Sequence, residues 1–200
     1  SQDNIYVIDE GNGLIKKFDS IGNFILNFED GILGQVFSLS VDGKDRIHIA
    51  DSENNRISVF DTNGKEISLP YSSEQSNNLN SPCGVFCLND GSTIIGDKSE
   101  FLLKHFDANG KLIRKIKREG LGFDEIYFIT QDKEHGIFAS DYWNNQIIHL
   151  DNNLQMVDIY RKLGNRFGEL GKTGGLSIHK DRLAVSNFDG RKVQFFNLQK

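Results

Sequence analysis

Asp51 and Asp61 lie ten residues apart and enclose the most chemically suggestive stretch of this chain. Between them stand the polar turn SENN (52–55) and then Arg56. An arginine beside paired asparagines and between two carboxylates could form a polar binding site. The same residues could equally belong to the scaffold, since Asp and Asn side chains also bind the backbone of turns. The rest of the chain distinguishes the two interpretations.

The same spacing recurs five times along the chain. A pair of acid or amide residues ten apart begins at residues 9, 51, 97, 141 and 187, so the copies start 42, 46, 44 and 46 residues apart. A feature present in every unit is expected to build that unit rather than to perform chemistry once. We therefore predict that the first carboxylate of each copy is a structural cap that accepts backbone N–H groups of its own turn. These predicted turn caps are Asp9, Asp51, Asp97 and Asp141.

Strand-forming sequence surrounds each pair. Runs such as RIHIA (46–50) and RISVF (56–60) alternate and are rich in β-branched residues, which predicts strands. The second aspartate leads into hairpin sequence, for example TNGK (62–65), because Asn-Gly tolerates the positive φ of a two-residue hairpin. Two further strands follow, so roughly 44 residues hold four antiparallel strands. The predicted fold class is all-β, a propeller of four-stranded antiparallel blades with about five repeats.

A strand followed by ADSENNRISVFDTNGK (50–65) resembles the NHL repeat of β-propeller proteins. The second copy matches closely, the first and fourth match well, and the third and fifth match loosely. The resemblance implies a single NHL-type propeller domain over residues 1–200. Propellers of this family serve as substrate or RNA readers of ubiquitin ligases, as extracellular sensors and, in relatives, as enzymes. The resemblance therefore predicts a fold and no particular function.

The strand count predicts a domain that is incomplete at both ends. Residue 4 already begins the strand before the first aspartate, so the innermost strand of that blade is missing. Residue 198 ends the strand before the fifth hairpin, so an outermost strand is missing there. NHL propellers usually have six blades, and the chain would then be part of a longer propeller. The unpaired blade edges could instead accept strands from another chain, giving a homo-oligomer or a subunit of a larger assembly.

Charge and composition narrow the class of partner. The net charge of −5 argues against bulk electrostatic binding of nucleic acid. No apolar run approaches the roughly 20 residues needed to span a bilayer. A first residue that is Ser, without a secretory leader, favours an exported (periplasmic or secreted) protein or a trimmed one, and leaves a cytoplasmic one open. Cys83 and Cys87, roughly 13 Å apart on one strand, are predicted to be thiols without a disulfide or a metal, and no cofactor is expected.

Function is expected where one copy departs from the others, in loops that the blades position. Tyr142-Trp143 replaces the small polar pair at 52–53, and Trp143 is the single tryptophan. The loop 160–173 carries four basic residues against one acid, one blade away from Phe123. Trp143 could alternatively wedge between blades, and the basic loop could be ordinary solvated surface. The predicted partner-binding residues are Tyr142, Trp143, Arg166, Phe167 and Phe123.

The sequence favours a non-catalytic scaffold whose loop face binds a protein, peptide or glycan. The first alternative is a metal-dependent enzyme, because propellers similar to gluconolactonase and the amidating lyase hold a divalent ion in the central channel. Here Asp42, Asp90, Asp132 and Asp181 end the predicted innermost strands. Their recurrence indicates turn caps, so no metal ligand and no catalytic residue is predicted. The second alternative is a structural subunit joined to its neighbours by strand addition.

Overall fold

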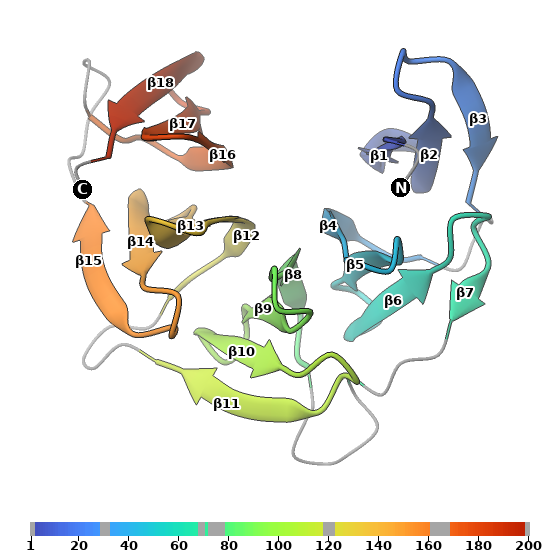
Figure 1. The fold of residues 1–200 in the computed structure, drawn as a ribbon, viewed down its shortest axis with the longest axis horizontal. Helices are drawn as coiled ribbons and strands as arrows, with labels where there is room; N and C mark the ends of the chain where they lie inside the picture. The colour runs from blue at the N-terminus through green and yellow to red at the C-terminus, as the bar shows by residue number, and fades with distance from the viewer. Residues whose placement is uncertain are drawn as a thin grey trace.

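The computed structural model describes residues 3–28, 33–67, 71, 79–117, 123–160 and 169–198. Within these ranges, 18 strands form five antiparallel sheets set around a common axis (Figure 1). The predicted all-β propeller is confirmed. The described part of the chain contains no helix long and apolar enough to cross a membrane.

The three middle blades have four strands each, and the two end blades have three. The first blade holds β1 (Ile5–Asp9), β2 (Leu14–Phe18) and β3 (Phe24–Asn27), with the short 3-10 helix η1 (Glu10–Asn12) after β1. The second holds β4 (Val36–Val41), β5 (Ile47–Asp51), β6 (Arg56–Phe60) and β7 (Glu66–Ile67). The third holds β8 (Pro82–Cys87), β9 (Thr93–Asp97), β10 (Leu102–Phe106) and β11 (Leu112–Ile116). The fourth holds β12 (Ile126–Asp132), β13 (Gly136–Asp141), β14 (Gln146–Leu150) and β15 (Met156–Tyr160), and the fifth holds β16 (Thr173–His179), β17 (Arg182–Asn187) and β18 (Lys192–Asn197).

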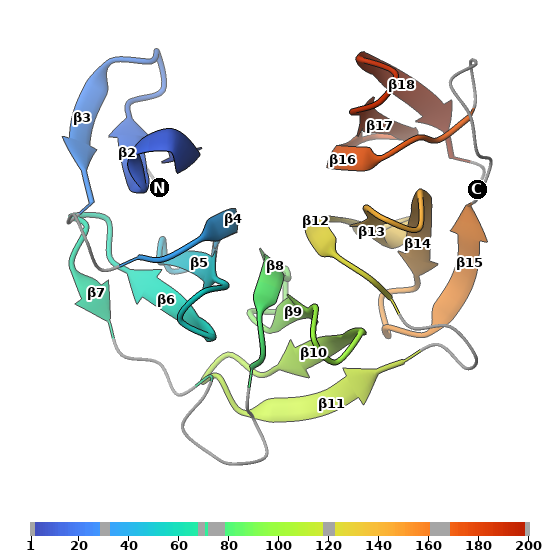
Figure 2. The ribbon, with the colours of Figure 1, turned by 180° about the vertical axis from the view of Figure 1, so that it is seen from behind.

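Strands β4, β8, β12 and β16 are innermost in their blades and run beside the central axis (Figure 2). Among the described residues, the first blade has no counterpart of β4 and the fifth has none of β7. The two end blades stand apart, so the ring of blades is open between them (Figure 1).

The hairpins differ in detail from the sequence prediction. In the third blade, Asp107 Oδ1 accepts the backbone N–H groups of Asn109 and Lys111 at 2.8 and 3.0 Å. Gly110 has φ +82°, whereas Asn109 is not among the residues with positive φ. The turn is therefore longer than the predicted two-residue hairpin, with glycine alone in the left-handed region and a shift in strand register between His105 and Phe106.

The cores lie between successive blades, because each of the three middle sheets buries both faces against its neighbours. Between the fourth and fifth blades, Phe138 and Ile147 pack with Leu183 and Val185. At the two ends of the array one face of the sheet stays open. Val193 and Phe195 on β18 are more than half exposed there.

Candidate functional site

The turn at Asp51 is part of the scaffold. Asp51 is fully buried, and its Oδ1 accepts the backbone N–H groups of Gly34 at 3.1 Å and Asn54 at 3.4 Å. Its Oδ2 accepts the Asn54 side chain and Nε of Arg56. The carboxylate thus ties its own turn to the segment that leads into β4, and it has no exposed surface with which to meet a ligand.

The same arrangement recurs in the next two blades. Asp97 accepts the N–H of Asn80 at 3.0 Å, and Asp141 accepts the N–H of Asp124 at 3.3 Å. Each donor lies 17 positions before its aspartate, as Gly34 does before Asp51. Such bonds hold the entry of each innermost strand against the turn of the same blade.

Asp9 differs from the prediction that it accepts N–H groups of its own turn. Its side chain makes no cap to η1 and instead binds the Asn12 side chain and Lys16. In this blade the short helix replaces the turn found in the others. The Lys16 and Asn12 donors together hold the pKa of this partly exposed carboxyl below its usual value.

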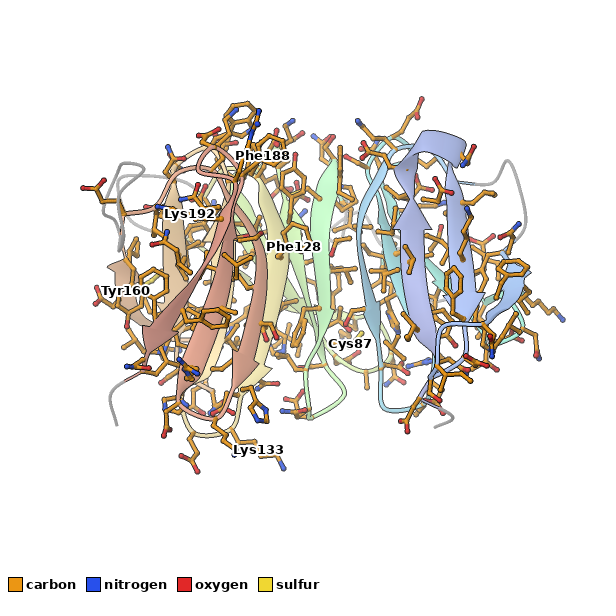
Figure 3. All side chains as sticks on the ribbon, turned by 90° about the horizontal axis from the view of Figure 1, so that it is seen from above. Cys87, Phe128, Lys133, Tyr160, Phe188 and Lys192 are labelled. Atoms are coloured by element: carbon orange, nitrogen blue, oxygen red, sulfur yellow. The ribbon has the colours of Figure 1, made fainter. Side chains whose placement is uncertain are left out.

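An axial cleft of about 800 Å³ opens among four of the blades. Its walls come from the inner strands and from the turns after β13 and β17, and most of the side chains are apolar or aromatic. Phe128 lies halfway down the wall, and Phe188 stands at one end of the molecule (Figure 3). A concave, mostly apolar space with a few polar groups is the usual form of a binding site.

A row of four aromatic rings runs along this cleft; we call Phe37, Tyr127, Tyr142 and Trp143 the aromatic row. The successive ring centroids are 5.0, 5.6 and 5.1 Å apart. The last two contacts are edge-to-face, an arrangement that stabilises aromatic pairs. Trp143 is nevertheless half exposed, and so it presents ring surface at the mouth of the cleft.

Two charged groups fix the outer end of the row. Lys172 Nζ lies 4.4 Å from the ring centroid of Trp143 and 5.5 Å from that of Tyr142, within the range of a cation–π interaction. The buried carboxylate of Glu125 accepts hydrogen bonds from Lys98, the Tyr127 hydroxyl and the Trp143 side chain. Burial acts to raise the pKa of Glu125, but these three donors outweigh it and lower the pKa. An ionised Glu125 therefore orients two rings of the row.

Of the predicted partner-binding residues that the structure describes, two lie at the cleft and one does not. Tyr142 and Trp143 lie together at the cleft. Phe123 is fully buried in the core between the third and fourth blades, so the prediction that it contacts a partner is wrong. Its backbone N–H donates to the Phe101 carbonyl. Arg166 and Phe167 lie outside the described residues.

Sequence reasoning missed Phe188, the most exposed aromatic side chain of the cleft, 71% exposed. Phe188 follows Asn187 as Tyr142 follows Asp141, at the same position of the repeat. The aligned copies therefore contained the signal that would have found it. Tyr127 and Phe37 were also missed, and they carry no such signal because they belong to ordinary strands.

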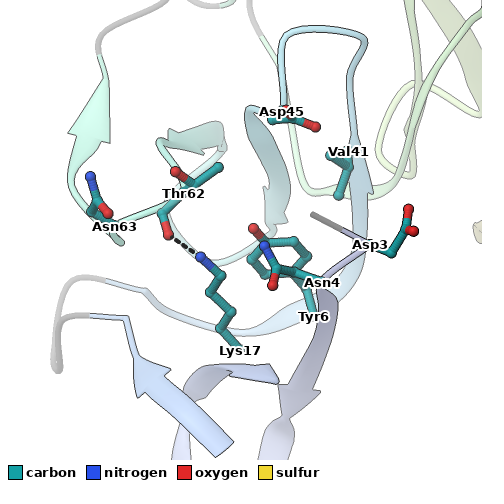
Figure 4. Close-up of a pocket in the computed structure, with 8 residues that line it drawn as sticks. All are labelled: Asp3, Asn4, Tyr6, Lys17, Val41, Asp45, Thr62 and Asn63. Atoms are coloured by element: carbon teal, nitrogen blue, oxygen red, sulfur yellow. Dashed lines mark hydrogen bonds between the residues drawn. The ribbon is translucent and has the colours of Figure 1, made fainter. Parts of the chain in front are cut away.

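A second hollow, of about 590 Å³, lies between the first and second blades (Figure 4). Lys17 stands in it, only 7% exposed, and donates to the Thr62 carbonyl at 2.7 Å. Its ammonium also lies 5.9 Å from the centre of the Tyr6 ring. The bond to Thr62 joins the two blades, and both contacts give the lysine a structural role.

A buried chain of polar groups links the second and third blades. His48 Nε2 lies 3.1 Å from Asp42, and its Nδ1 lies 2.9 Å from the Tyr71 hydroxyl, which also reaches Thr93. Burial lowers the pKa of His48. The residue types suggest an acid–base relay, but both rings are sealed from solvent. These hydrogen-bonded polar groups therefore hold the second and third blades together.

The predicted strand-end caps and thiols occupy the following places. Asp42, Asp90 and Asp132 each accept backbone N–H groups of the hairpin after an innermost strand. Asp181 differs, and its carboxylate faces His135. Cys83 and Cys87 are free thiols on β8, and burial raises their pKa values to about 12 and about 11.

No family model matches the chain, and no curated protein sequence matches it. Solved structures do match. A streptogramin B lyase has a TM-score of 0.69 and 13% identity, over 100% of this chain and 67% of the other. A nidogen/laminin complex has a TM-score of 0.76 and 16% identity, over 98% of this chain and 72% of the other. A virginiamycin B lyase from Staphylococcus aureus has a TM-score of 0.64 and 14% identity, over 100% of this chain and 68% of the other. At such identities the likeness shows the fold alone: the chain is a β-propeller.

Proposed function

We propose that the protein is a non-catalytic propeller of NHL type whose axial cleft binds a protein, peptide or glycan partner. The observation that carries the proposal is the aromatic row, which ends in the exposed Trp143 and shares its cleft with the exposed Phe188. Large, rigid aromatic side chains bury much area at little cost in conformational entropy, and they commonly dominate binding energy.

The polar groups of the cleft favour binding over catalysis. Glu125 lines the cleft together with Glu10, and three donors already engage Glu125. It is therefore committed to positioning Tyr127 and Trp143. The similar structures include lyases as well as a propeller from a protein complex, and so a metal-dependent enzyme with a site in the central channel is the alternative.

Removal of the two exposed rings tests the proposal. Peptides selected from a random library, and glycans selected from an array, serve as probes against the wild-type protein. We expect the variant Trp143→Ala, Phe188→Ala to bind the selected probe at least about 10-fold more weakly, because two interface aromatics commonly contribute more than 1.4 kcal/mol. The matched control is Phe24→Ala, which removes a similarly exposed ring on the outer strand β3, outside the cleft. Equal affinity of all three proteins would refute the site.

A second proposal concerns self-association through the open end blades. β1 at its inner edge and β18 at its outer edge have no neighbouring strand in the described part of the chain. Val193 and Phe195 on β18, and Ile5 and Val7 on β1, expose apolar side chains on these sheets. Unpaired edges with apolar faces favour strand addition.

Sedimentation velocity across a wide range of concentration measures this association. We expect reversible growth beyond the monomer at high concentration, and less of it in the variant Val193→Lys, Phe195→Lys, because charged side chains protect strand edges. A compact monomer at every concentration would contradict the proposal.

A further inference from the structure

Two hairpins meet on the face of the propeller opposite Phe188. The turn between β12 and β13 carries Lys133, which lies at the far end of the molecule from Phe188 (Figure 3). The turn between β16 and β17 carries Asp181 and belongs to the next blade. Together they line a hollow of about 560 Å³ that is distinct from the axial cleft.

His135 lies between Asp132 of the first hairpin and Asp181 of the second. Its side chain is 7% exposed, and its Nδ1 lies 2.9 Å from Oδ1 of Asp132. An ionised carboxylate only accepts hydrogen bonds, so Nδ1 carries the proton and donates it to Asp132. In the neutral ring Nε2 is then an acceptor. That buried nitrogen has no hydrogen-bond partner among the described residues.

The unpartnered nitrogen is aimed at a carboxylate. His135 Nε2 and Asp181 Oδ1 are 3.5 Å apart, and a carboxylate oxygen of Glu134 completes a group whose ligand atoms all lie within 4.8 Å of one another. Two lone pairs facing each other at this distance repel unless a cation stands between them. Zinc bonds of about 2.0–2.1 Å place two ligand atoms of a tetrahedral ion about 3.4 Å apart, close to the observed separation.

We propose that Glu134, His135 and Asp181 form a site for one divalent transition-metal ion, with Zn²⁺ as the best fit. One imidazole and two carboxylates suit zinc, and metal-binding histidines commonly donate their other N–H to a carboxylate, as His135 does to Asp132. Asp132 is then a positioning residue. Three protein ligands with exposed carboxylates leave a fourth position open to solvent.

The site departs from the repeat in the way that a specialised feature does. The corresponding hairpins of the second and third blades carry Asp42 and Asp90, which cap their turns without an adjoining Glu-His pair. The hollow also holds Lys133 and Lys180, but the carboxylates of Asp132, Glu134 and Asp181 outnumber these two ammonium groups. The local charge therefore still favours a cation.

Calorimetric titration of chelator-treated protein with Zn²⁺ tests the site. We expect one ion per chain, and about 100-fold or greater weakening in His135→Ala and Asp181→Asn. Asp132→Asn keeps the metal ligands and should weaken binding about 10–100-fold, as loss of an orienting carboxylate does. The control is His179→Ala, an exposed histidine outside the group, which should bind as the wild type does.

Thermal unfolding and Co²⁺ absorption supply readouts that separate binding from misfolding. Zn²⁺ should raise the melting temperature of the wild type and of His179→Ala, but not that of Asp181→Asn, whose exposed position makes a folding defect a poor explanation. Bound Co²⁺ should give a ligand-field spectrum that His135→Ala lacks. No binding of Zn²⁺ or Co²⁺, or equal binding by His135→Ala and His179→Ala, would overturn the proposal.

Discussion

Replacing Asp97 with alanine is expected to lower the free energy of unfolding by about 3 kcal/mol, because it breaks a buried ion pair. Asp97 and Lys104 both have fully buried side chains, and Lys104 Nζ lies 2.6 Å from Oδ2 of Asp97. The same carboxylate also accepts the N–H groups of Asn80 and Glu100. Glu100, 3.0 Å from the ammonium, remains as a partner and keeps the loss from being larger.

Urea unfolding of matched variants measures this effect. Asp107→Ala is the control, since Asp107 caps the hairpin of the same repeat from a more exposed position. It should cost about 1 kcal/mol, the usual value for a lost cap. The double variant Asp97→Asn, Lys104→Met should lose less stability than the two single changes together, because it removes both charges. Equal losses at Asp97 and Asp107 would show that the buried pair contributes nothing beyond a turn cap.

Gly84→Ala should destabilise the protein by at least about 3 kcal/mol or prevent folding, because backbone occupies the space of the new side chain. A Cβ at Gly84 would lie 2.0 Å from the carbonyl oxygen of Ile126 on the next blade. A Cβ at Gly96 would meet the same oxygen at 2.7 Å. At these two glycines the backbones of the third and fourth blades lie too close together for a side chain to fit between them.

The control for Gly84 lies on another innermost strand. A Cβ at Gly175 on β16 meets only the Ser186 hydroxyl at 3.7 Å, an ordinary contact. Gly175→Ala should therefore change the free energy of unfolding by less than about 1 kcal/mol in the same urea experiment. If both alanine variants unfold alike, the close approach at Ile126 is not a constraint on the fold.

The fold could be predicted from the sequence because the information is repeated. Each blade carries its own pair of acids or amides and its own alternating strands, so five imperfect copies support the same predicted fold. The predicted strands before and after Asp51 and Asp97 are β5, β6, β9 and β10. The hairpin type was missed because Asn-Gly fits both a two-residue turn and a longer turn that ends with glycine in the left-handed region.

The candidate site could be predicted only in part. Tyr142 and Trp143 stand out because they break the repeat, but burial is a property of packing between blades. Phe123 therefore reads as a loop residue in the sequence and is a core residue in the structure. The contact between His135 and Asp181 joins hairpins 46 positions apart in different blades, and no spacing rule within one repeat reveals it.

The fluorescence of Trp143 tests whether the axial cleft binds the partner. Trp143 is the single tryptophan of the chain, so its emission reports on the mouth of the cleft and on no other site. Titration with a selected peptide or glycan should shift or quench the emission with the same midpoint that calorimetry gives for binding. Saturable binding by calorimetry with unchanged Trp143 emission would place the partner elsewhere on the propeller and refute the cleft as its binding site.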